Sequence, residues 1–162
     1  MALIVQKYGG TSVGNPERIK NVAKRVAKFH AQGHQVVVVV SAMSGETNKL
    51  IALAKEVQAS PDPRELDQIC ATGEQVTIGL LSMALMDIGV PARSYTGGQV
   101  KVLTDNTFTK ARILSIDESN MRADLDAGKV VAGIARQEAA GFWCVADKGN
   151  DTGVIWVKPR GV

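Results

Sequence analysis

The sequence is poor in cysteine and contains no long apolar run. Its two cysteines, Cys70 and Cys144, lie far apart and form neither a metal-binding nor a disulfide pattern, which favours a reduced, cytoplasmic protein. No uninterrupted apolar stretch reaches the about 18 residues typical of a membrane-spanning helix, so we expect no membrane partner. Met1-Ala2-Leu3 leads directly into a candidate strand, without the basic segment and cleavage site of a secretory signal.

Neither sign of charge dominates the chain. It has 19 Lys and Arg against 16 Asp and Glu, a net charge of +3 over 162 residues. The basic residues are scattered among acidic ones, and only 4% of the residues are aromatic, so no basic block with interleaved aromatic side chains is present. We therefore expect no nucleic-acid partner. The hydrophobic fraction of 45% is ordinary for a globular domain with a core of its own.

Two common phosphate-binding patterns are missing, since the chain has neither the GxxxxGK[ST] of a P-loop nor the GxGxxG of a dinucleotide fold. Instead, Lys7-Tyr8-Gly9-Gly10 stands between an apolar run and a helix start at Asn15-Pro16. Glycines let backbone N–H groups approach an anion closely, and a lysine supplies positive charge. The segment predicts a phosphate-binding loop, although a simple tight turn has the same glycine requirement.

Candidate strands and helices alternate along the first 135 residues. The helix signals include Asn15 before Pro16 and the capping pattern Asp62-Pro63-Arg64-Glu65. Five consecutive valines predict a strand buried on both faces, as in a parallel sheet. The candidate strands are Leu3–Lys7, Val36–Val40, Ala92–Thr96, Arg112–Ile116 and Lys129–Ala132. This order predicts an α/β protein with three αβα layers and a mostly parallel sheet.

Three polar residues stand out beyond the lysine loop. Ser41 and Thr47 follow the valine strand, at the end of the sheet where open α/β folds bind ligands, although Thr47 is equally suited to cap the next helix. Thr72-Gly73-Glu74-Gln75 predicts an interruption of the helix that begins near Pro63, with a restart there. Glu74 is then either a glutamate favoured by the dipole at a new helix start or a carboxylate that binds an ammonium group.

Taken together, these segments resemble the N-terminal part of the aspartate kinase family, over roughly residues 1–132. The resemblance rests on five matches in register. They are K-Y-G-G-T-S at 7–12, V-V-V-V-V-S-A-M at 36–43, Thr47, A-T-G-E at 71–74 and S-Y-T-G-G-Q at 94–99. The family has the amino-acid kinase, or carbamate kinase-like, fold.

The resemblance implies ATP-dependent phosphorylation of the β-carboxylate of L-aspartate to 4-phospho-L-aspartate, the first step towards lysine, threonine and methionine, with Mg²⁺ accompanying ATP. It implies Lys7 as the catalytic residue and Thr47 and Glu74 as ligands of aspartate. The residues that it places at the ATP phosphates are Lys7, Tyr8, Gly9, Gly10 and Ser41.

The last part of the chain departs from the family. We expect residues 1–135 to form the N-terminal part of the kinase domain and residues 136–162 to be a divergent tail. The family's Gly-Arg-Gly-Gly-Ser-Asp-Thr loop is only faintly matched by Gly149–Gly153, so its catalytic aspartate is not transferred to Asp151. The predicted kinase fold is therefore incomplete.

Two alternatives follow. The chain is another member of the wider family, acting on glutamate, acetylglutamate or uridylate, or it is an inactive half-domain that serves for binding or oligomerisation. Half of such a sheet leaves an exposed edge, so we expect pairing with a second copy or with a longer aspartokinase chain.

Overall fold

The computed structural model describes residues 1–134 and 153–156 of the chain. Apart from one strand at 153–156, the predicted tail at 136–162 lies outside the described residues. The elements are β1 (Leu3–Tyr8), α1 (Pro16–Ala31), β2 (Gln35–Val40), α2 (Glu46–Val57), α3 (Pro63–Asp87), β3 (Ala92–Tyr95), β4 (Leu103–Thr104), β5 (Ile113–Ser115), α4 (Ser119–Asp126), β6 (Val130–Ile134) and β7 (Gly153–Trp156).

The main sheet has five strands in the order β3-β6-β2-β1-β7. The pairs β1–β2, β2–β6 and β3–β6 are parallel, and β7 runs antiparallel to β1. In the central pair, Tyr8 at the end of β1 is in register with Val40 at the end of β2. The mostly parallel sheet predicted from the valine run and the strand–helix rhythm is confirmed.

Local sequence signals set the helix ends. The Asn15 side-chain oxygen accepts a 2.9 Å hydrogen bond from the Arg18 N–H, with Pro16 as the first helical residue of α1. Asp62 caps α3 in the same way, accepting from the N–H groups of Arg64 at 2.9 Å and Glu65 at 3.1 Å. Both predicted helix starts are therefore confirmed.

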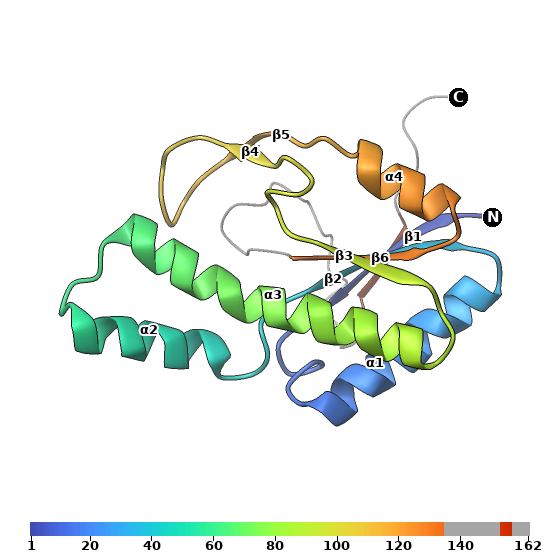
Figure 1. Ribbon diagram of the computed structural model, residues 1–162, viewed down its shortest axis with the longest axis horizontal. Helices are drawn as coiled ribbons and strands as arrows, with labels where there is room; N and C mark the ends of the chain where they lie inside the picture. Colours follow the sequence, from blue (N-terminus) through green and yellow to red (C-terminus); the bar gives the residue numbers. More distant parts are fainter. Residues whose placement is uncertain (135–152, 157–162) are drawn as a thin grey trace.

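Helices cover both faces of the sheet, which makes three layers (Figure 1). On one face α1 and α3 bury the larger cluster, whose fully buried members include Val26, Val36, Val38, Leu81 and Leu85. On the other face α4 helps to bury a smaller cluster of Tyr95, Val100, Leu125 and Val131. Because the two covers are unequal, Val37 and Val39 are only half-buried, and the expectation of full burial on both faces of β2 is wrong.

The helix α3 runs unbroken from Pro63 to Asp87, so the predicted interruption at residues 72–75 is wrong. The Thr72 hydroxyl donates to the carbonyl of Ile69 at 2.7 Å, inside the helix, rather than capping a new start. Gly73 is buried against neighbouring elements, and this packing offsets the low helix propensity of glycine.

The predicted strand at 112–116 forms as β5 but does not join the main sheet. It pairs antiparallel with β4, which sequence reasoning missed, in a separate two-stranded sheet. The connection between the two is short, and parallel strands need a crossover of about a dozen residues or more. The Thr109 N–H in this connection donates to the Asp67 carboxylate at 2.9 Å, which ties the hairpin to α3.

By length and composition, α3 is also apolar enough to cross a membrane, with a mean hydropathy of 1.4 over its best window. Ile78, Leu81 and Leu85 from this window pack in the larger cluster between α1 and the sheet. Part of its apolar character is thus that of a core helix, and this helix alone is weak evidence for a membrane span.

Candidate functional site

The predicted site residues gather where β1 and β2 end. Since Tyr8 and Val40 are in register, the loops that begin at Gly9 and Ser41 leave the sheet side by side at one edge. The Ser41 N–H donates to the Tyr8 carbonyl at 3.2 Å and extends the pairing by one residue. The parallel arrangement thus brings the lysine loop and the serine loop together, as expected for a ligand site of an open α/β sheet.

The lysine loop is a tight turn with a charge above it. The Ser12 N–H donates to the Gly9 carbonyl at 3.0 Å, which closes the turn. Lys7 is exposed, and its Nζ lies 3.9 Å from the place where a Cβ of Gly9 would be. A Cβ at Gly10 would lie only 2.9 Å from the Ala42 carbonyl oxygen, so this position has no room for a side chain. The segment can therefore be both a tight turn and a phosphate-binding loop.

Tyr8 does not present its side chain to this loop. It is 5% exposed and belongs to the larger core cluster, and its hydroxyl donates to the Gln6 side-chain oxygen at 3.1 Å. Burial raises the pKa of Tyr8, and the positive charge of Arg25 opposes that shift. Only the backbone of Tyr8 is thus placed to serve a ligand at the loop.

Thr47 lies in the first turn of α2 with its side chain exposed. It is not the N-cap, so that expectation is wrong. The cap position is taken by Gly45, whose φ of +85° is the left-handed conformation that glycine adopts most readily. No side chain caps this helix start.

Glu74 lies in the middle of the 25-residue helix α3 and is half-buried. A helix dipole acts on groups within the first or last turn, so it gives no reason for a glutamate here. The preceding residue, Gly73, contacts the neighbouring elements closely. A Cβ at Gly73 would lie 3.2 Å from the Ala42 Cβ and 3.9 Å from the Glu46 Cβ. Gly73 and Glu46 thus lie close together. Glu74 directly follows the first and Thr47 directly follows the second.

Ala42 contacts both the lysine loop and α3, and it therefore joins the two halves of the candidate site. It is 7% exposed, with Gly10 on one side and Gly73 on the other. One half offers a lysine amine and backbone donors, which suit an anion, and the other offers a carboxylate, which suits a cation. Sequence reasoning assigned no role to Ala42 or Gly73. A glycine inside a long apolar helix was the available signal for close packing.

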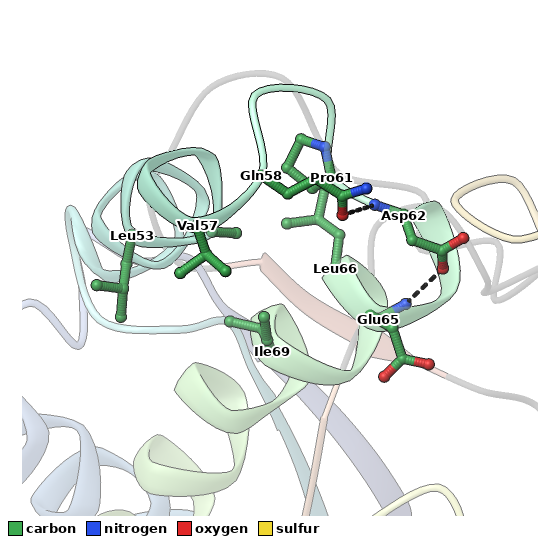
Figure 2. Close-up of a pocket in the computed structure, with 9 residues that line it drawn as sticks. Leu53, Val57, Gln58, Pro61, Asp62, Glu65, Leu66 and Ile69 are labelled. Atoms are coloured by element: carbon green, nitrogen blue, oxygen red, sulfur yellow. Dashed lines mark hydrogen bonds between the residues drawn. The ribbon is translucent and has the colours of Figure 1, made fainter.

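The structure also has an apolar pocket of about 260 Å³ at the C-terminal end of α2, away from Thr47 (Figure 2). It is lined by Leu53, Ala54, Val57, Gln58, Pro61, Asp62, Glu65, Leu66 and Ile69. At about 1.5 Å per helical residue, the two ends of α2 lie roughly 16 Å apart. None of the predicted site residues lines this pocket, so it is separate from the loop site.

Within the part of the chain that the structure describes, no group of three or more His, Cys, Asp or Glu residues could hold a metal ion.

Comparison with known proteins bears on the family and the fold. The chain is 62% identical to an aspartokinase of Pseudomonas aeruginosa over 152 residues, which cover 94% of this chain and 35% of that protein. It thus spans about a third of the length of this relative. Among solved structures, an aspartate kinase from Synechocystis matches with a TM-score of 0.70 and 42% identity, covering 87% of this chain and 24% of that one.

A more distant structure shows the fold alone. It is E. coli aspartokinase III in complex with aspartate and ADP, with a TM-score of 0.68 and 19% identity, covering 86% of this chain and 42% of that one. The amino acid kinase family itself matches residues 2–157, nearly the whole sequence. With the predicted three-layer fold confirmed, the chain belongs to the amino acid kinase family.

Proposed function

We propose that this chain is the part of an aspartate kinase that holds the ATP phosphates and the amino-acid substrate. The observation that carries the proposal is the position of Ala42 between Gly10 and Gly73, which brings the lysine loop and Glu74 to one end of the sheet. The 62% identity to an aspartokinase supports aspartate as the acceptor. The reaction is the transfer of the γ-phosphoryl group of ATP to the β-carboxylate of L-aspartate, which yields 4-phospho-L-aspartate and ADP.

The phosphate half of the site needs charge neutralisation more than covalent chemistry. A β-carboxylate oxygen forms the new bond to phosphorus while the bond to the ADP oxygen breaks. Lys7 is exposed at the loop and can neutralise charge on the transferring group. The N–H groups of Gly9 and Gly10 are suited to the phosphate oxygens, because neither residue has a side chain to block the approach.

Gly10 also lets the lysine loop pack closely on the segment after β2, since a Cβ there would meet the Ala42 carbonyl oxygen at 2.9 Å. Mg²⁺ would enter with ATP and neutralise its phosphate oxygens.

The amino-acid half rests on Glu74 and Thr47. The Glu74 carboxylate would pair with the α-ammonium group of aspartate, and the Thr47 hydroxyl would bind the same substrate. Fixing the ammonium group decides which carboxylate faces the phosphates. Ser41 directly follows the last residue of β2, belongs to the phosphate half and would face the reacting groups.

The test is ADP release by the purified chain with Mg-ATP and a panel of acceptors. We expect ADP formation with L-aspartate above that with glutamate, N-acetylglutamate or UMP. A higher rate with one of the other acceptors would contradict the proposal and support a different member of the family.

A binding or oligomerisation module remains the second candidate, because the chain spans only about a third of its relative's length. Calorimetry with Mg-ATP and with L-aspartate separates the two, since a module that binds neither ligand gives no heat of binding. Association with a second copy or with a longer aspartokinase chain stays a prediction. Sedimentation of the chain alone, and in a mixture with a longer aspartokinase chain, would test this association.

A further inference from the structure

A buried glycine lies inside α3 at a position where a helix gains nothing from it. Gly73 is in the middle of Pro63–Asp87, and glycine is a poorer helix former than alanine. Its φ is not in the left-handed region, so no backbone conformation requires it. The reason for a glycine here must come from its surroundings.

The surroundings leave little room for a methyl group, because a Cβ here would require its nearest neighbour to move by a few tenths of an ångström. A Cβ at Gly73 would lie 3.2 Å from the Ala42 Cβ and 3.4 Å from the Leu50 Cδ1. The other glycine of the same helix, Gly79, has nothing within 4 Å of its Cβ position. Of these two glycines, only Gly73 allows α3 to approach the loop after β2 and the helix α2.

Ala42 is restrained against retreat from α3. On its other side, a Cβ at Gly10 would meet the Ala42 carbonyl oxygen at 2.9 Å. The loop is held at one end by the bond from the Ser41 N–H to the Tyr8 carbonyl, and at the other by a 3.1 Å bond from the Glu46 N–H to the Met43 carbonyl. A methyl group added at position 73 would therefore displace α3 rather than the loop.

We propose that Gly73 is a positioning residue, whose contact with Ala42 sets the distance between the Glu74 carboxylate and the lysine loop. Glu74 follows Gly73 directly, so a shift of α3 moves the carboxylate relative to Lys7 and Gly10. This inference rests on the proposed function for the identity of the ligand, an amino acid bound through its ammonium group. It adds the element that fixes where this ligand sits relative to the phosphates.

The experiment compares Gly73→Ala with Gly79→Ala, the same change on the same helix. We expect Gly73→Ala to weaken L-aspartate affinity by about tenfold or more, because small displacements of substrate-binding groups are costly, and to change Mg-ATP affinity by less than about twofold. It also lowers Tm by about 3 °C or more. Gly79→Ala leaves both affinities unchanged and does not lower Tm. Equal behaviour of the two variants overturns the inference.

A double variant separates the contact from a general loss of stability. Ala42→Gly alone lowers Tm, but in the Gly73→Ala background it removes the clashing methyl group and raises both Tm and aspartate affinity. Additive changes in Tm would overturn the inference. If the unaltered chain binds no aspartate, the proposed function fails, whereas the Tm comparison of the four proteins still decides whether the contact sets the position of α3.

Discussion

At the scale of single residues, the site depends on where side chains are absent. Gly10 and Gly73 both contact Ala42: a Cβ at Gly10 would clash with it at 2.9 Å, and a Cβ at Gly73 would be tight at 3.2 Å. Tyr8 illustrates the opposite case, since its ring is needed in the core and is therefore withdrawn from the loop. The residues that carry charge, Lys7 and Glu74, lie close in sequence to these packed positions.

Lys7→Ala tests the charge on the phosphate side. We expect turnover to fall by about 100-fold or more, because a group that stabilises developing charge contributes on this order. The free energy of unfolding should change by less than about 0.5 kcal/mol, since Lys7 is exposed. Steady-state ADP release and urea unfolding measure the two quantities. Lys20→Ala, on the exposed side of α1, is the matched control, and unchanged activity of Lys7→Ala would refute the assigned role.

At the scale of elements, α3 links the core to the site. Its C-terminal half packs Ile78, Leu81 and Leu85 into the larger cluster, while its middle carries Gly73 and Glu74. It lies side by side with α2 (Figure 1), and Gly73 is the residue where α3 contacts Leu50 and Glu46 of that helix. The start of this helix is set by Asp62, which accepts two backbone hydrogen bonds.

Asp62→Ala removes the cap of α3. We expect the free energy of unfolding to fall by about 1 kcal/mol, because two N–H groups of the first turn lose their acceptor. Asp62→Asn keeps an acceptor oxygen and should retain most of the stability. Asp87→Ala removes the same charge at the other end of the helix, where a carboxylate is unfavourable, and should not destabilise the protein. Urea unfolding compares the three variants, and equal losses for Asp62→Ala and Asp87→Ala would contradict the capping role.

At the scale of the whole molecule, the Asp124 carboxylate is one of the groups that tie α4 to the sheet. Asp124 accepts from the Lys129 amine at 2.6 Å and from the Tyr95 hydroxyl at 2.5 Å, and it pairs with Arg93 at 3.3 Å. Its side chain is 13% exposed. The hydrogen bond from Lys129, followed by that from Tyr95, lowers the pKa of Asp124 below its ordinary value of 3.8.

This shift predicts an acid-dependent stability. Because the folded pKa lies below the unfolded one, the stabilisation is present above about pH 4 and is lost as the pH falls through the folded value. Asp124→Asn should therefore be less stable than the unaltered chain at pH 7, and the difference should shrink towards pH 3. Asp87→Asn, on the exposed end of α3, serves as the control. Urea unfolding at a series of pH values measures the difference in the free energy of unfolding between Asp124→Asn and the unaltered chain. A difference that stays constant with pH would contradict the prediction.

Much of the fold was predictable because its signals are local. Asn15-Pro16 and Asp62-Pro63 mark helix starts whatever surrounds them, since a cap is satisfied by its own first turn. The valine run marks a central strand, and Lys7 to Gly10 marks a strand-to-helix loop. The same local patterns, taken in register, also predicted the amino-acid kinase fold, and the match over residues 2–157 confirms membership of the amino acid kinase family.

The remaining features of the fold depend on contacts between segments that are distant in the sequence. The sequence alone specified caps, strand-forming runs and the lysine loop, because these need only neighbouring residues. It did not specify that α3 continues through Gly73, that Tyr8 turns into the core, or that β5 pairs outside the main sheet. Each of these follows from packing or pairing with residues far along the chain, and such contacts override local propensity when they bury enough surface.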